Sequence, residues 1–377
     1  MKKALGISLI ALLPFSILAT PTFAAVKAGD VCSKSGLTSI VSGKKYTCVK
    51  TGKKLVWKLS TSTQPNNAPT QTNKATAEIP APQLFGSLDV LVADKKNIQS
   101  VAFSEVQKLA SQKNSNPLII NAKIGPTTKL TDQKYADALQ TAHNIFKNSN
   151  QPPTLDILYH NFADLNWAKD QWQFIKKGNG DTFPGLEKCK GITWCSYGVT
   201  LPGDKNAGLI VVADGKVTFA EFLGVNEIHE YTHVVQLHIM NNAPLSAPGW
   251  WTEGQAMFFG VAGASKDLNS YLLLQNRQRS IWNFKAIPDF ELTQSSISNF
   301  LLSKSKDNIQ NSLVLSYSLG QAFVESLVAI KGADLSMKIW VEIAKGRTFN
   351  DAFNSLYGFT LEQAVEEISP IIFARFK

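Results

Sequence analysis

The feature that most constrains this chain is a polar motif inside an apolar helical segment. Residues 218–240 have the apolar spacing of a helix, and within them stands the motif His229-Glu230-Tyr231-Thr232-His233. Four residues advance a helix by about 400°, so the two imidazoles lie one turn apart on one face. Burying the side chains of His229, Glu230 and His233 without polar partners would cost free energy. Either the fold supplies a partner, or the motif belongs to the solvent-facing side of an amphipathic helix.

A metal ion is the partner that best fits this spacing. Neutral imidazole nitrogens are preferred ligands of tetrahedral zinc, and His229 and His233 can reach one ion from neighbouring turns. A catalytic zinc needs a third protein ligand. The next predicted helix opens with Trp250-Trp251-Thr252-Glu253-Gly254, and 19 residues separate His233 from Glu253, enough for the chain to reverse direction. We therefore expect Glu253 to complete a site for one Zn²⁺ per chain.

Glu230 is the predicted catalytic base. It follows the first histidine and would lie beside the metal, where zinc lowers the pKa of a bound water toward neutrality. Glu230 would take a proton from this water and pass it to the leaving amine. A metzincin would carry glycine and histidine at the positions of Gln236 and Ile239, which excludes that class. His238 faces another side of the helix and is not expected to bind the metal.

The pattern His229-Glu-x-x-His233 followed by Trp250-x-x-Glu253-Gly resembles the gluzincin group of zinc metallopeptidases. This group belongs to the peptidase MA-like clan and includes thermolysin-like, aminopeptidase-like and bacterial collagenase-like enzymes. Two later segments, 315–324 and 346–358, resemble helices of its helical lobe, so the similarity covers about residues 215–370. The aminopeptidase segment Gly-x-Met-Glu-Asn is absent, and Met257 stands where thermolysin-like enzymes carry an acidic residue.

The resemblance implies a zincin-like α+β fold and a hydrolase that cleaves a peptide or protein substrate. It also implies that Tyr317 donates a hydrogen bond to the developing oxyanion, although a buried helix tyrosine explains this residue equally well. Two other functions stay open. One is a catalytically silent cell-surface binding protein on a metallopeptidase scaffold, and the other is a hydrolase of cell-wall polymers.

The N-terminus has the pattern of a secretory signal. Lys2 and Lys3 precede an apolar run, residues 4–19, and Thr22-Phe23-Ala24 is a small-x-small cleavage site. We expect residues 1–24 to be removed, which leaves a secreted or cell-surface protein. An uncleaved N-terminal anchor is the alternative.

The net charge of +9 is concentrated near the N-terminus. Residues 26–60 contain eight lysines against one acidic residue, whereas residues 61–377 contain equal numbers of basic and acidic residues. Such a basic module favours anionic cell-wall polymers or lipid head groups. Nucleic acid is not an expected partner of an exported protein. The alternative is a lysine-rich surface that only keeps the protein soluble.

Four cysteines, an even number, suit an oxidising compartment. We predict two local disulfides, Cys32–Cys48 and Cys189–Cys195. The first would stabilise the basic module by about 3 kcal/mol through its short loop. A cysteine zinc site is the alternative, but no C-x-x-C pair is present. The module resembles a small cysteine-stapled domain at the start of secreted actinobacterial proteins.

The chain divides by composition into four parts. After the signal peptide, residues 25–59 predict a small β module, and the polar, proline-bearing residues 60–83 predict a flexible linker. Residues 84–377 predict a monomeric metallopeptidase domain, with a mixed α/β lobe over 84–240 and a mainly helical lobe over 241–377. Strands are expected at 154–160 and 208–213, the latter as an edge for an extended peptide. Helices are expected at 131–148, 164–177, 218–240, 251–263, 267–280, 312–331, 334–345, 348–356 and 360–370.

Overall fold

The computed structural model describes residues 8–9, parts of 27–59, and most of 83–377. Within 83–377 it leaves out residues 129–133, 176–195, 202–206, 214–223, 242–244, 282–283, 285–286, 288–289 and 304–312. The chain separates into two compact units, Met1–Pro14 with Ala81–Lys377, and Phe15–Pro80. Each unit is described by itself.

The smaller unit contains an antiparallel sheet of three strands in the order β2-β3-β4. These strands are β2 (Thr38–Val41), β3 (Lys44–Thr51) and β4 (Lys54–Leu59). Cys48 is buried on β3 opposite Trp57 of β4. Cys32, Cys189 and Cys195 lie outside the described residues, so both disulfide pairings stay predictions.

The larger unit is built on a five-stranded sheet in the order β1-β7-β8-β6-β5. Its strands are β1 (Ser8–Leu9), β5 (Ile119–Ile124), β6 (Thr154–His160), β7 (Ser196–Leu201) and β8 (Ala207–Ala213). Strands β5, β6 and β8 run parallel, and β7 is antiparallel to β8. Strand β6 is buried almost throughout, as expected of a parallel strand covered on both faces.

The strand predicted at 154–160 is confirmed by β6. The prediction that 208–213 offers a free edge is wrong, because β8 is hydrogen-bonded to β7 on one side and to β6 on the other. The outer strand on that side is β1 of the N-terminal segment, which pairs with β7. A strand's position in a sheet depends on pairing with distant segments, and the local sequence pattern does not contain that information.

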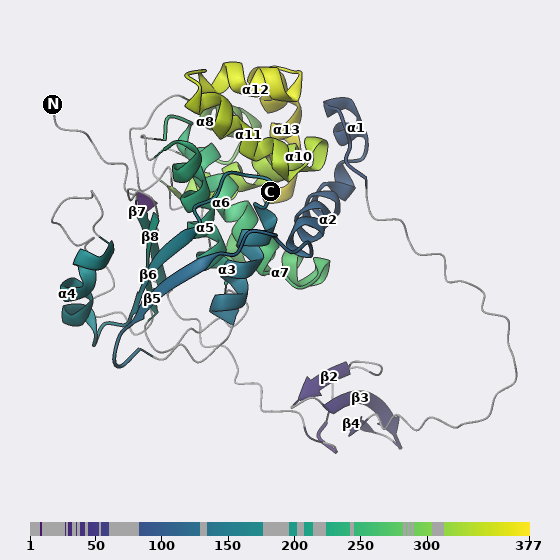
Figure 1. Ribbon diagram of the computed structural model, residues 1–377. Helices are drawn as coiled ribbons and strands as arrows, with labels where there is room; N and C mark the ends of the chain where they lie inside the picture. Colours follow the sequence, from purple (N-terminus) through teal and green to yellow (C-terminus); the bar gives the residue numbers. More distant parts are fainter. Residues whose placement is uncertain are drawn as a thin grey trace, which may run out of the picture. The chain divides into compact units, whose positions relative to one another are not determined.

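Helices cover both faces of the sheet (Figure 1). Helix α4 (Leu165–Ile175) contacts β6 and β8, and α5 (Val225–Ile239) contacts β7 and β8 from the side on which α3 (Lys134–Ile145) also lies. All three helices were expected from apolar periodicity. Helix α5 begins later than predicted, and residues 218–223 lie outside the described part of the chain.

The described part of the chain after α5 is mainly helical. Its described helices are α6 (Gly249–Ala264), α7 (Leu268–Ile281), α8 (Gln294–Leu302), the π-helix η5 (Ser316–Gly320), α10 (Gln321–Lys331), α11 (Ala333–Ala344), α12 (Phe349–Tyr357) and α13 (Leu361–Phe376). Two predictions need correction. The helix expected at 312–331 contains the π-helical turn, and the helix expected at 360–370 continues through Pro370 to Phe376.

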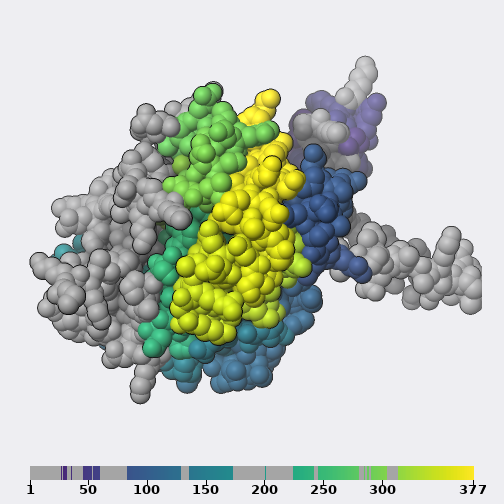
Figure 2. Space-filling model, turned by 90° about the horizontal axis from the view of Figure 1, so that it is seen from above, coloured from purple at the N-terminus to yellow at the C-terminus, as the bar shows by residue number. Residues whose placement is uncertain are grey.

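Three N-terminal elements were not predicted from the sequence: α1 (Leu88–Ala93), η1 (Lys95–Asn97) and α2 (Ile98–Ala110). They join the helical part of the unit, because α2 packs on α10 and α1 contacts α10 and α13. Figure 2 shows this arrangement on one face, with the C-terminal helices in yellow beside the N-terminal helices in blue. The fold is thus α+β and mostly helical, with a mixed α/β region followed by a helical region.

One stretch, Leu313–Lys331, is long and apolar enough to cross a membrane, but 89% of its apolar window is buried inside the protein. It contacts α6, and its α10 part also contacts α2 and α13. Its apolar character is therefore explained by its place in the core.

Candidate metal centre

The candidate site lies between α5 and α6, which pack side by side in opposite directions. Glu253 in the second turn of α6 meets His233, and Gln236, one turn further along α5, reaches back to Thr252. Aromatic contacts fix the start of α6, since the ring of Trp250 meets Phe323 of α10 at 5.2 Å. This anchoring explains why tryptophan precedes the glutamate in the motif.

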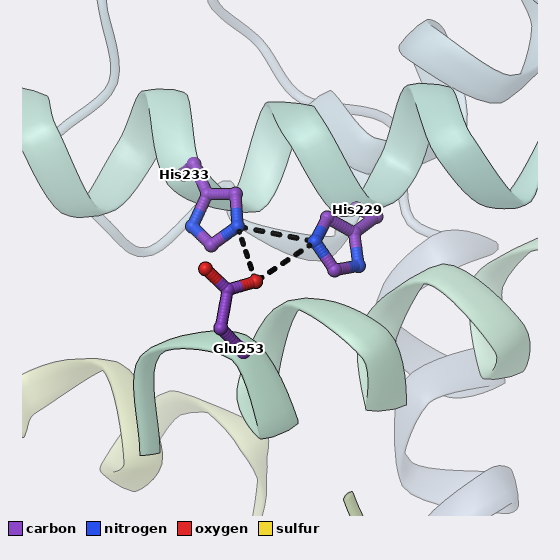
Figure 3. A group of neighbouring side chains, drawn as sticks. All are labelled: His229, His233 and Glu253. Atoms are coloured by element: carbon purple, nitrogen blue, oxygen red, sulfur yellow. Dashed lines mark hydrogen bonds and ion pairs between the residues drawn. The ribbon is translucent and has the colours of Figure 1, made fainter. Parts of the chain in front are cut away.

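Three side chains converge at the centre of this pair (Figure 3). The Nε2 atoms of His229 and His233 are 3.1 Å apart, and Glu253 Oε2 lies 3.4 Å from the first and 3.3 Å from the second. All three side chains are buried. Ligands of a tetrahedral zinc, at bond lengths of about 2.0–2.1 Å, are about 3.3 Å from one another. The three atoms are therefore spaced as a zinc ion requires, and two imidazoles with one carboxylate leave a fourth position for a reactant.

The electrostatics of the three groups are consistent with a cation site. Burial lowers the pKa of His229 to about 4. Burial also works against charge on His233 and Glu253, but their mutual attraction outweighs it: the pKa of His233 rises to about 9, and that of Glu253 falls well below its ordinary value. Without a metal, the positive charge of protonated His233 therefore balances the negative charge of the Glu253 carboxylate. A divalent cation would replace the proton on His233.

Glu230 lies next to this group and is completely buried. Burial raises its pKa to about 7, and its charge interacts with those of His233 and Glu253. Its Oε2 accepts a hydrogen bond of 2.7 Å from the hydroxyl of Thr200 on β7, whereas its Oε1 has no hydrogen-bond partner in the described part of the chain. One carboxylate oxygen is thus held by the sheet and the other is left for a further partner. A carboxyl group with a pKa near neutrality can both accept and return a proton.

Tyr317 is brought to the same place by the π-helix η5. Its ring meets the ring of His229 edge-on, with 5.8 Å between the centroids. A single π-helical turn inside an α-helix is rare and occurs frequently at functional sites. The structure thus brings Tyr317 beside the predicted ligands. Its assignment as a hydrogen-bond donor to substrate stays a prediction.

A chain of buried side chains supports His233 from behind. Its Nδ1 lies 2.8 Å from Gln236 Oε1, and the Gln236 amide donates to Gln255 Oε1 at 2.9 Å and to the carbonyl of Thr252 at 3.2 Å. Gln255 Oε1 also accepts the indole N–H of Trp340 at 2.7 Å. Histidine ligands of metals typically donate their second nitrogen to such a partner.

Sequence reasoning did not identify Thr200, Gln255 or Trp340 as parts of the site, and it used Gln236 only to exclude metzincins. A signal existed for Gln236, because an amide three residues after His233 lies on the same side of a helix that is otherwise apolar. Thr200 on β7 and Trp340 on α11 are far from the motif in the sequence, and Gln255 lies on α6 two residues after Glu253; no local pattern marks any of the three.

Within the described residues, His229, His233 and Glu253 form the one group of three or more His, Cys, Asp or Glu side chains that fits a metal ion. Comparisons of the chain with protein-family models, curated proteins and solved structures find no match. The chemistry of the site therefore rests on this geometry: a buried His-His-Glu triad consistent with an HExxH…E zinc site.

Proposed function

We propose that this protein is a secreted zinc metallopeptidase of the gluzincin type, with His229, His233 and Glu253 as ligands of one zinc ion. The observation that carries the proposal is the convergence of two imidazoles and a carboxylate at tetrahedral spacing, with the second carboxylate of Glu230 beside them. Zinc in such a site makes water nucleophilic near neutral pH and polarises a carbonyl group.

Three residues of the chain then have separate roles in the proposed reaction. Glu230 is the general base, and its pKa of about 7 lets it accept a proton at neutral pH and deliver it to the leaving amine. Thr200 holds one oxygen of that carboxylate in place. Tyr317, next to His229, is the proposed donor to the carbonyl oxygen as negative charge develops on it.

The sheet supports a peptide as the substrate. Strand β7 carries Thr200 to Glu230, and its outer side pairs antiparallel with β1, with Ser8 opposite Thr200 and Leu9 opposite Val199. An extended segment of polypeptide thus fits against β7 at the height of the general base. Strand addition is a common mode of peptide recognition, because backbone hydrogen bonds supply affinity without requiring a particular sequence.

The test is zinc binding and hydrolysis of casein, each with and without a chelator. We expect about one zinc per chain, and we expect the chelator to abolish hydrolysis. Glu230→Gln should retain zinc and lose about two to four orders of magnitude in kcat, because the amide cannot accept a proton. Glu227→Gln is the matched control: Glu227 is a second buried glutamate of α5, and burial raises its pKa to about 7 as well.

Two further variants examine the ligands. His233→Ala and Glu253→Ala should lose zinc, whereas His238→Ala, a half-buried histidine of the same helix, should bind it as the wild type does. Zinc binding without hydrolysis of any peptide in a library would favour the catalytically silent binding protein. Full zinc retention in Glu253→Ala at low free zinc would contradict the ligand set.

We also propose that the protein acts outside the cytoplasm, after removal of residues 1–24, and that residues 26–60 bring it to anionic cell-wall or membrane surfaces. The signal pattern and the net charge of +7 in residues 26–60 support this.

A further inference from the structure

We infer that Gln236, Gln255 and Trp340 form a one-way hydrogen-bond relay that fixes the tautomer of His233 and so prepares its Nε2 for the metal. The relay residues are positioning residues, since none of them is among the three proposed ligands. The inference deepens the proposed function and rests on it.

The direction of the relay is set at its far end. An indole N–H can only donate, so the atom of Gln255 that lies 2.7 Å from Trp340 Nε1 must be the amide oxygen. The other end of the same amide agrees. Ser336 gives its hydroxyl proton to the carbonyl of Ala333 at 2.7 Å, so its oxygen accepts from the Gln255 NH₂ at 3.1 Å. Turning the Gln255 amide over would break both contacts.

The orientation of Gln255 decides that of Gln236. The oxygen of Gln255 and the backbone carbonyl of Thr252 can only accept, so the atom of Gln236 that lies 2.9 Å and 3.2 Å from them must be its NH₂ nitrogen. The oxygen of Gln236 is then the atom 2.8 Å from His233 Nδ1. An amide oxygen only accepts, and therefore Nδ1 must carry a proton. In a neutral imidazole this leaves the lone pair on Nε2, the atom that faces His229 and Glu253.

The two histidines differ in the hydrogen bonding of Nδ1. The Nδ1 of His229 is buried and has no hydrogen-bond partner within the described part of the chain, so no comparable relay orients that ring. His229 is positioned instead by ring contacts with His233 and Tyr317. The relay makes His233 the pre-organised ligand of the pair.

The experiment measures zinc affinity of the full-length protein by competition with a chromophoric chelator. Gln236→Leu removes the acceptor, and we expect the Kd for zinc to rise about 10- to 100-fold. Trp340→Phe removes the donor at the far end and should raise Kd by less, because Ser336 still holds Gln255. The matched control is Trp251→Phe. Trp251 is as fully buried as Trp340, but its indole N–H has no hydrogen-bond partner among the described residues.

A second readout separates positioning from mere packing. In zinc-loaded protein with ¹⁵N-labelled histidine, the Nδ1 proton of His233 should exchange slowly with solvent, and it should become fast-exchanging in Gln236→Leu. Thermal unfolding in the presence of chelator shows how much stability the metal-free fold of each variant has lost. A lower melting temperature with unchanged Kd and unchanged exchange would overturn the relay, as would equal effects of Trp340→Phe and Trp251→Phe.

The relay and the proposed function can fail separately. If Gln236→Leu weakens zinc binding but the protein has no hydrolytic activity, the relay is supported and the peptidase is contradicted. Hydrolysis by a protein whose zinc affinity is unchanged in Gln236→Leu supports the peptidase and contradicts the relay.

Discussion

At the scale of single residues, the contact that most directly shapes the proposed chemistry is the one between Thr200 and Glu230. The Thr200 hydroxyl has two acceptors within reach, the carboxylate of Glu230 at 2.7 Å and its backbone carbonyl at 2.9 Å. Both lie in a buried environment, where a hydrogen bond to a charged group contributes about 1.5–3 kcal/mol. This hydrogen bond lowers the pKa of Glu230 against the larger, opposite effect of burial.

Thr200→Val should therefore impair catalysis and leave zinc binding intact. Valine keeps the shape but removes the hydroxyl, so the pKa of Glu230 should rise further. Since the base acts when deprotonated, the acidic limb of the kcat/KM profile should move to higher pH, and kcat at neutral pH should fall about tenfold. Thr200→Ser, which keeps the hydroxyl, should restore most of the rate. Equal pH profiles for the valine variant and the wild type would show that the contact plays no part in catalysis.

At the scale of elements, the site depends on how closely η5 approaches α6. Gly254 of α6 and Gly320 of η5 face each other: a methyl group on Gly254 would overlap the backbone of Gly320, and one on Gly320 would overlap the carbonyl of Trp250. Only glycine permits this distance between the two backbones. The same π-helical turn carries Tyr317, so the close approach holds Tyr317 beside His229.

Gly320→Ala should force η5 away from α6 and destabilise the protein by about 1–3 kcal/mol, the usual cost of overpacking a core. Activity should fall together with stability, because Tyr317 moves with the turn. Gly249→Ala is the control on α6, where an added methyl meets nothing within 4 Å. Chemical unfolding of the two variants measures the difference, and an unchanged midpoint for Gly320→Ala would refute the close approach.

At the scale of the whole molecule, the charge of the chain and its proposed chemistry belong to different units. The surplus of positive charge lies in residues 26–60, and the metal ligands lie in the larger unit. Among the described lysines of the smaller unit, Lys27, Lys50, Lys54 and Lys58 are exposed. Charge displayed in this way attracts anionic polymers, and salt weakens the attraction because screening at physiological ionic strength acts over about 8 Å.

Replacing those four lysines with glutamine should weaken sedimentation with isolated cell walls and leave casein hydrolysis near the wild-type rate. Deleting residues 25–83 should abolish the sedimentation altogether. Binding of the wild type should decline between low and high salt. If the wild type and both variants sediment equally, targeting by charge is excluded, and the module only supplies a soluble surface.

The sequence by itself determined what depends on local geometry. Helical periodicity places His229 and His233 one turn apart, and the 19 residues between His233 and Glu253 are enough for the chain to reverse direction and bring a second helix against the first. The buried strand β6 and most helices after it were predicted for the same reason, since apolar periodicity is read within one element.

Only the tertiary structure decided which distant side chains meet the site. Thr200 reaches Glu230 across 30 residues, and Trp340 reaches Gln255 across 85. The internal position of β8 and the π-helical turn that carries Tyr317 also depend on packing against neighbouring elements. Hydrogen bonds and close backbone contacts of this kind have short range, so they are fixed by the packing of whole elements rather than by the sequence around each residue.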